Sequence, residues 1–257
     1  MTTLAVSTPP TFRYESELVA VVQRFLAGAV FSSPSRESVE VFTEVPARLG
    51  VPDVSAVRYR WDMIRDRVSN GVQPLTSEPS VRAMLLLRRR RLDTAGLAEA
   101  LRMSKDHVRR AVVADLRDRG WLADASAGAL LELRRSARPA GVRVVTVEAK
   151  LRDWQSAVGQ ARRQRYSADD AYVALDGRAA ERIAEDVPAI ARQGIGVIAV
   201  DPASSSMRVV RRPSTRLRSE SNIVGRTLIA ERGLDLLSCG QRSGEVYPVF
   251  GWTLPEH

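Results

Sequence analysis

The 257-residue sequence predicts an α/β fold interrupted by an inserted helical domain, and three features indicate this class. Strand and helix patterns alternate through residues 142–211, as they do in α/β proteins. Residues 77–136 change to a run of closely spaced helices. Stretches rich in turn-forming residues flank that run at 70–79 and 137–141. We therefore expect one discontinuous α/β domain, with the helical domain inserted between its two parts.

The N-terminal part predicts one helix and two strands. Apolar residues recur at helical spacing through residues 14–31, before Pro34 and Ser35 break the pattern. Residues 39–45 alternate apolar and polar side chains, which is typical of a half-exposed strand. Residues 51–59 form a second strand that begins just after Pro52, and the two strands together suggest a hairpin-like pair.

The middle block predicts a winged helix-turn-helix over residues 77–136. Ser104 is a good N-cap for its third helix, and Gly120 is a suitable residue to follow the end of that helix. In chain order, the block reads as helices at 80–91, 94–101 and 105–119, then short strands at 121–122 and 129–133 joined by a turn at 126–128.

The C-terminal part returns to the α/β pattern. Its predicted strands are 142–151, 171–175, 195–200 and 207–211, and its predicted helices are 152–166, 179–192 and 218–232. Residues 195–200 are almost continuously apolar, which indicates a strand buried on both faces, and residues 207–211 are expected at a sheet edge. We expect residues 11–69 and 140–257 to share one central mixed sheet flanked by helices.

Charge and composition favour a nucleic-acid partner. The formal charge is +9, and the excess is mostly arginine, whose planar guanidinium suits phosphate. A solvated basic surface in an arginine-rich composition is the alternative. One cysteine and two histidines exclude an intramolecular disulfide, a cysteine zinc cluster and a histidine-rich metal site. No apolar run is long enough to cross a membrane, and the N-terminus lacks a signal-peptide pattern, so we expect no membrane association and a cytoplasmic location.

Glu148 and Lys150 are the most specific chemical feature. Residues two apart on a strand face the same side, so this carboxylate and this ammonium point together within an apolar strand. Carboxylates hold hard divalent cations such as Mg²⁺, and a neighbouring lysine can orient the attacking water or stabilise charge on a phosphate. Asp53, at the start of the earlier strand, is the candidate for a second carboxylate. The alternatives are an exposed ion pair on an edge strand and, for Asp53, a role in a turn.

Pro52-Asp53 followed by Glu148-Ala149-Lys150 resembles the PD-(D/E)xK nuclease superfamily, which includes restriction enzymes and Holliday-junction resolvases. The sequence after Lys150, with its Trp154, Gln160-Ala161 and 170–175 segments, is similar to the family's strand, helix and strand. The resemblance implies a restriction-endonuclease-like core with Mg²⁺, or Mn²⁺, held by Asp53 and Glu148.

Further roles are implied by the same resemblance. Lys150 would assist catalysis, and Gln160 would lie beside the metal. Glu44 matches a further acidic position, and Glu15 or Glu17 of the first helix could supply another. The two halves of the motif lie farther apart than is usual in the family, and the inserted domain accounts for this separation.

The inserted domain supplies the candidate DNA-binding residues. Its third helix would present Lys105, Arg109 and Arg110 to the major groove. Arg88, Arg89, Arg90 and Arg91 would attract phosphate without reading sequence. A protein-interaction or dimerisation module is the alternative for this domain.

Together these features predict a metal-dependent DNA endonuclease, with the winged helix positioning the DNA and a homodimer as one way to cut both strands. Two alternatives remain open. One is a non-catalytic DNA-binding regulator on a nuclease-like scaffold, and the other is a protein-interaction subunit of a DNA repair or defence complex.

Overall fold

The computed structural model describes residues 11–31, 39–123, 130–214 and 219–244. Its strands are β1 (Val39–Thr43), β2 (Val54–Tyr59), β3 (Gly141–Lys150), β4 (Asp170–Asp176), β5 (Ile195–Asp201) and β6 (Ser206–Arg211). The helices before β3 are α1 (Glu15–Val30), α2 (Trp61–Ser69), α3 (Glu78–Leu87), α4 (Thr94–Leu101), α5 (Lys105–His107), η2 (Val108–Val113) and α6 (Ala114–Asp118). Those after it are α7 (Trp154–Gln164), α8 (Gly177–Arg182), α9 (Val187–Arg192) and α10 (Glu220–Ser238).

The described strands form one open mixed sheet in the order β1-β2-β3-β4-β5-β6. The pairs β3–β4 and β4–β5 are parallel, and the other neighbouring pairs are antiparallel. The central strands β4 and β5 are buried along almost their whole length, as their apolar sequence predicts, and β6 lies at an edge. Strands β2 and β3 are neighbours, although helices α2 to α6 lie between them in the chain.

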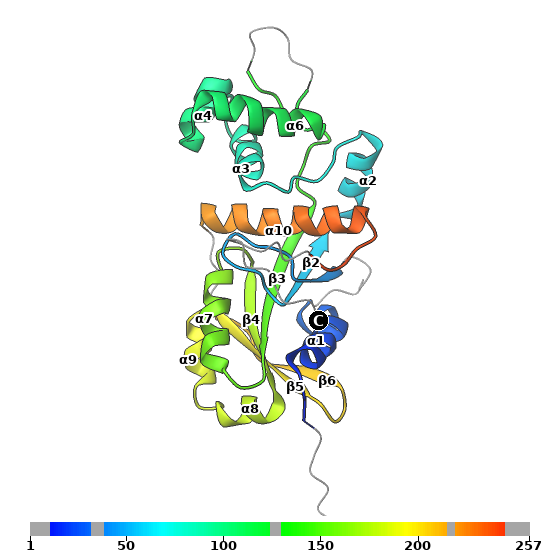
Figure 1. Cartoon of the computed structure of the whole chain (residues 1–257), viewed down its shortest axis with the longest axis vertical. Coiled ribbons are helices and arrows are strands. Elements are labelled where there is room, and N and C mark those ends of the chain that lie inside the picture. The colour runs from blue at the N-terminus through cyan, green and yellow to red at the C-terminus, as the bar shows by residue number, and fades with distance from the viewer. Residues whose placement is uncertain (1–10, 32–38, 124–129, 215–218, 245–257) are drawn as a thin grey trace, which may run out of the picture.

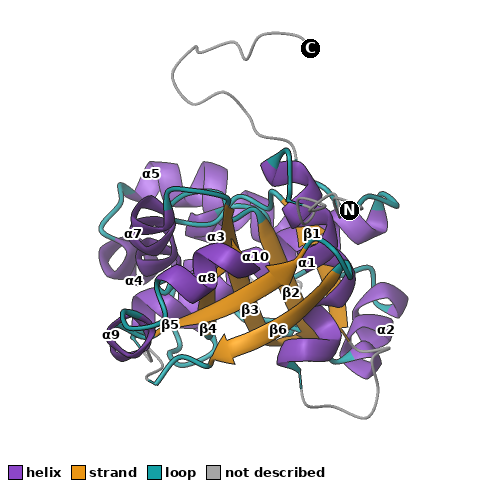
Figure 2. Cartoon of the chain, turned by 90° about the horizontal axis from the view of Figure 1, so that it is seen from below, coloured by secondary structure: helices purple, strands orange, loops and turns teal. Residues whose placement is uncertain are grey.

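Helices cover both faces of the sheet (Figure 2). The buried side of α1, including Leu18, Val22 and Leu26, packs on one face against alternate residues of the strands. Helices α7, α8 and α9 cover the other face over β3, β4 and β5. The second half of α10, including Ile229 and Ala230, completes that face over β2 and β3. The general α/β prediction, a mixed sheet flanked by helices, is confirmed.

Helix α10 lies between the sheet and the part of the chain formed by α2 to α6 (Figure 1). Val224 and Leu228 of α10 belong to the hydrophobic cluster of α3, α4, η2 and α6, whereas Ile229 and Ala230 belong to a cluster of the sheet. One helix therefore contributes to two cores, and the predicted boundary between domains is crossed by shared apolar packing.

A buried ion pair reinforces this junction. Arg67 of α2 and Glu231 of α10 are each 1% exposed, and their nearest charged atoms lie 2.7 Å apart. Glu231 also accepts a hydrogen bond from the main-chain N–H of Leu75 at 3.1 Å. The guanidinium of Arg67 lies 4.7 Å from the ring centroid of buried Trp121, whose indole N–H donates to the carbonyl of Gln73 at 2.7 Å. The α2–α6 part is thus held against α10, and through it against the sheet, by buried polar contacts.

Three elements differ from the sequence-based prediction. Helix α2 was not predicted, because it buries only Ile64 and the charged Arg67 and so lacks a recognisable apolar stripe. The single helix predicted over 179–192 is two short helices, since Pro188 removes a main-chain donor and disfavours helical conformation before it. The helix predicted over 105–119 is helical throughout but contains the π-helical segment η2.

The two short strands predicted near the end of the middle block are represented in the described residues by isolated bridges. Leu122 pairs with Leu133, and Leu131 pairs with Leu92, all in antiparallel fashion. The turn predicted at residues 126–128 lies outside the described residues.

Candidate active site

Asp53 and Glu148 face each other across two neighbouring strands. The antiparallel register pairs Val54 with Val147, so the residue before β2 stands opposite Glu148 on the same face of the sheet. The carboxylate of Asp53 accepts a hydrogen bond from the main-chain N–H of Ala149 at 2.7 Å. This contact fixes Asp53 at the C-terminal end of β3. Two carboxylates that are far apart in the sequence are therefore brought together by strand pairing.

Glu148 lies in an environment that is unfavourable for a charged carboxylate. Its side chain points toward α7 and is 4% exposed. Burial and the negative charge of Asp53 raise the pKa of Glu148 from 4.5 to about 8, while Lys150 and Gln164 act in the opposite direction. The amide of Gln164 donates a hydrogen bond to Glu148. Glu148 thus favours its protonated form beside Asp53, and its ionised form would gain from a compensating positive charge.

Lys150 lies at the end of the same strand and is held by the first helix. Its ammonium donates to the carboxylate of Glu15, at the start of α1, over 2.7 Å. Burial lowers the pKa of Lys150, but the hydrogen bond to Glu15 and the charges of Asp53, Glu15 and Glu148 raise it by more. The ammonium therefore remains protonated beside the two carboxylates.

The space between the sheet and α7 contains further polar groups. Ser55 and Thr146 are a cross-strand pair on the face that carries Asp53 and Glu148, and their buried hydroxyl groups have no hydrogen-bond partner among the described residues. The side-chain oxygen of Gln160 on α7 is buried and equally without a partner there. Oxygen atoms of this kind are suitable ligands or water-binding groups at a cation site.

The resemblance implies that Gln160 lies beside the metal, and Gln164, to which the sequence assigned no role, forms a hydrogen bond with Glu148. Both glutamines lie on the buried side of α7, one turn apart, and Gln164 is the one that donates to Glu148. Helical periodicity places both residues on the same face, so spacing alone does not choose between them. The choice depends on where α7 sits along β3.

Glu44 lies outside β1, which ends at Thr43. Its backbone is in the left-handed region with φ of 53°, its main-chain N–H donates to the carbonyl of Asp53 at 3.3 Å, and its side chain is exposed. Within the described part of the chain, no group of three or more histidine, cysteine, aspartate or glutamate side chains is arranged to hold a metal ion. The oxygen donors at the candidate site are therefore two carboxylates and the neighbouring amide and hydroxyl oxygens.

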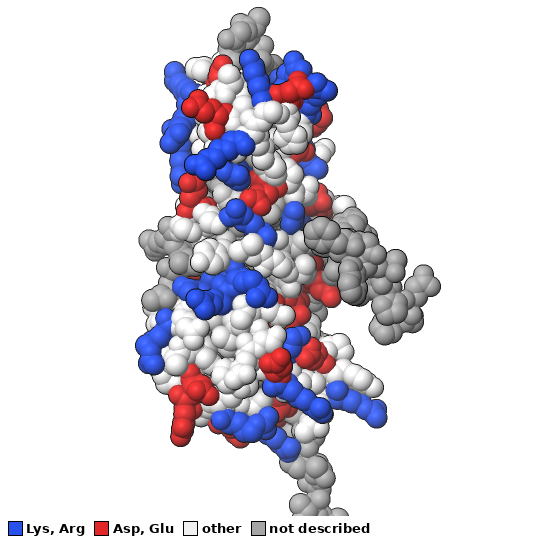
Figure 3. All heavy atoms as spheres, turned by 60° about the vertical axis from the view of Figure 1, so that its left-hand side comes forward, with Lys and Arg blue, Asp and Glu red and all other residues white. Residues whose placement is uncertain are grey.

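The candidate DNA-binding residues lie on the α2–α6 part of the molecule and are exposed. Lys105, Arg109 and Arg110 project from α5 and η2, and both arginines form ion pairs with Asp106 on the same helical surface. Arg88 to Arg91 follow the end of α3. Figure 3 shows lysine and arginine side chains both over this upper part and lower on the same side of the molecule, with acidic side chains between them.

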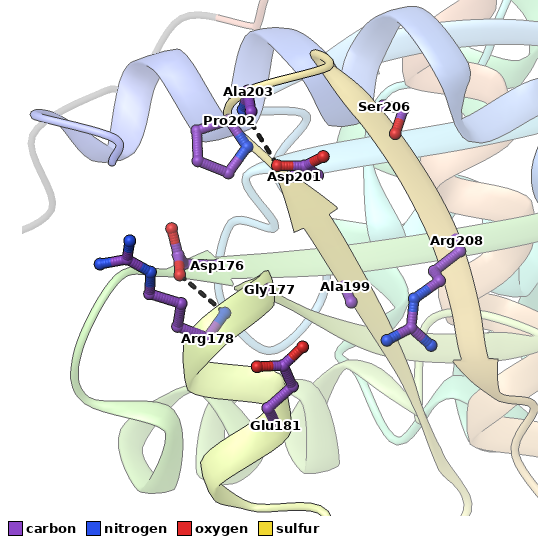
Figure 4. A pocket seen from close by; sticks show the side chains of 10 residues that line it. All are labelled: Asp176, Gly177, Arg178, Glu181, Ala199, Asp201, Pro202, Ala203, Ser206 and Arg208. Atoms are coloured by element: carbon purple, nitrogen blue, oxygen red, sulfur yellow. Dashed lines mark hydrogen bonds between the residues drawn. The ribbon is translucent and has the colours of Figure 1, made fainter. Parts of the chain in front are cut away.

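A cavity lies at the C-terminal ends of β4 and β5 (Figure 4), and Asp53, Glu148 and Lys150 are not among the residues that line it. It measures about 430 Å³ and lies between the start of α8 and the β5–β6 hairpin. Two of its three acidic residues have structural partners: Asp176 accepts from the main-chain N–H of Arg178 at 2.9 Å, and Asp201 accepts from that of Ala203 at 3.0 Å, while Glu181 is the third. These contacts cap a helix and a turn, so Asp53, Glu148 and Lys150 remain the candidate site.

Comparisons of the chain with protein-family models, with curated proteins and with solved structures find no match. No helix in the described residues has the length and apolar character required to cross a membrane.

Proposed function

We propose that this protein is a metal-dependent DNA endonuclease of the PD-(D/E)xK type. In this proposal, residues 11–69 and 140–257 form the nuclease core, and residues 77–136 form an inserted winged helix-turn-helix that positions DNA. The observation that carries the proposal is the meeting of Asp53 with Glu148 beside Lys150.

The residues present fit a hard divalent cation. Burial of Glu148 beside Asp53 is costly without positive charge, as the raised pKa of Glu148 indicates, and the buried side-chain oxygen of Gln160 has no described partner. Asp53 and Glu148 would hold Mg²⁺ or Mn²⁺. The cation would polarise the scissile phosphate and acidify a bound water.

The protein's own side chains have separate roles in this proposal. Lys150 carries a positive charge beside the carboxyl pair and would orient the attacking water or stabilise charge on the phosphate. Glu15 holds the ammonium of Lys150 in place, and Gln164 fixes the orientation of Glu148.

Cleavage of duplex, branched and single-stranded DNA, each with Mg²⁺ or Mn²⁺, tests the proposal. Asp53→Ala and Lys150→Ala should each reduce cleavage by about 100-fold or more while DNA binding is retained. Asp201→Asn changes an exposed acid at the end of β5 and serves as the control, with cleavage unchanged. Equal cleavage by wild type and both site variants would refute the assignment. DNA binding without cleavage under any of these conditions would instead support the non-catalytic regulator.

A further inference from the structure

A groove lined by arginines borders the segment that leads to β3: one part of it lies against the end of α3, and the other lies against α2 and Ala123. The segment after α3 and the one that leads to β3 are joined where the main-chain N–H of Leu131 donates to the carbonyl of Leu92 at 2.8 Å. The groove consists of two hollows of about 400 and 710 Å³. We call it the arginine groove; its basic residues are Arg88, Arg90, Arg91, Arg134, Arg135 and Arg138, the last three of which line both hollows.

The arginine groove carries a large excess of positive charge. Among the described residues that line it, Glu132 and Asp66 are the acidic ones. Arg134 donates from Nε to the carbonyl of Leu122 at 3.1 Å, so it also supports the local fold. Arg135 and Arg138 are exposed, and no ion pair between described residues engages either of them.

On the surface of α5 and η2, by contrast, the arginines form ion pairs. Asp106 accepts from the guanidinium of Arg109 at 2.6 Å and also from that of Arg110. One carboxylate thus offsets part of the charge of the two arginines that the sequence assigns to DNA recognition. Arg88, Arg90 and Arg91 of the arginine groove are, like Arg135 and Arg138, in no ion pair between described residues, a property shared by some other exposed arginines of this part such as Arg102 and Arg117.

We propose that the arginine groove binds the phosphate backbone of duplex DNA and supplies much of the electrostatic affinity of the α2–α6 part. Guanidinium groups form paired hydrogen bonds with phosphate oxygens, and every basic residue of the groove is arginine rather than lysine. Such contacts position DNA and carry no sequence information. This inference rests on the proposed function, since it assigns the surface that holds the DNA to be cut.

The test is the salt dependence of duplex binding by the full chain, measured by fluorescence anisotropy in EDTA so that no cleavage occurs. The variant R135Q/R138Q removes two exposed cations and leaves Arg134 in place. If each arginine neutralises one phosphate, the slope of log affinity against log salt should become shallower by about 1.8, and affinity near 0.1 M salt should fall about 60-fold. The matched control is R182Q/R192Q, which removes two exposed arginines of α8 and α9 outside the α2–α6 part, and for which the slope should change by less than about 0.9.

The outcomes separate this inference from the proposed function. If R135Q/R138Q binds duplex with the same affinity and the same salt slope as the wild type, the inference about the arginine groove is overturned. Cleavage could still depend on Asp53 in that case. A wild-type chain that binds no duplex at any salt concentration would overturn the arginine groove, and one that binds neither duplex, branched nor single-stranded DNA would overturn both proposals. Tighter binding of polyglutamate than of duplex, lost in R135Q/R138Q, would assign the groove to an acidic protein and overturn the DNA assignment. Equal urea midpoints for wild type and both variants are required as the folding control.

Discussion

Replacing Glu148 by glutamine should change how the stability of the protein depends on pH. The raised pKa means that the folded state retains a proton on Glu148 that the unfolded state releases above pH 4.5. Because the folded state then binds more protons, the contribution of Glu148 to stability is greatest below pH 4.5 and falls as pH rises toward about 8. The slope from this group is about 1.4 kcal/mol per pH unit.

The whole contribution of Glu148 is of the order of 5 kcal/mol between these two pH values, which is an upper bound for a carboxyl coupled to Asp53. Urea denaturation at a series of pH values measures it. The free energy of unfolding of the wild type should fall by several kcal/mol across this range. That of Glu148→Gln should not show this fall, so the variant should be the more stable protein above pH 8. Glu185→Gln changes an exposed glutamate and should follow the wild-type curve.

A divalent cation provides the second half of this test. If Asp53 and Glu148 hold Mg²⁺, the cation should stabilise wild type at high pH and have little effect on Glu148→Gln, because ligand binding to the folded state adds to the free energy of unfolding. Binding should also weaken as pH falls below about 8, since the cation competes with the proton on Glu148. Parallel pH curves for wild type and Glu148→Gln would refute the burial argument itself.

Three other substitutions have defined outcomes. Glu231→Gln leaves the buried Arg67 without its counter-charge and should lower the free energy of unfolding by about 3–5 kcal/mol in urea melts. One cooperative transition is expected there, and a separate early transition of the α2–α6 part would contradict the shared role of α10. Glu15→Gln should lower the pKa of Lys150, measured as faster acylation of that amine at fixed pH, and an unchanged rate would exclude the ion pair. Gly225→Ala places a Cβ 2.4 Å from a main-chain oxygen of the α7–β4 loop. It should therefore lower the free energy of unfolding by about 1–3 kcal/mol in the same melts, and a neutral effect would argue against this close packing.

The general class of the fold was predictable because its signals are local. Valine-rich and continuously apolar segments predict β3, β4 and β5, whose burial on both faces requires no other information than the sequence of each strand. The alternation of side chains along a strand also places Glu148 and Lys150 on one side. By contrast, α2 gave no local signal, since the residue that anchors it most deeply is Arg67, an amino acid normally found at the surface.

The sequence by itself determined which segments become strands and helices, and which residue types are available for chemistry. Only the tertiary structure decided which of them meet. The pairing of β2 with β3 brings Asp53 opposite Glu148, the position of α7 along β3 selects Gln164 rather than Gln160 for contact with Glu148, and the start of α1 brings Glu15 to Lys150. The physical reason is that periodicity fixes the face of an element, whereas register and helix position depend on packing between segments far apart in the chain.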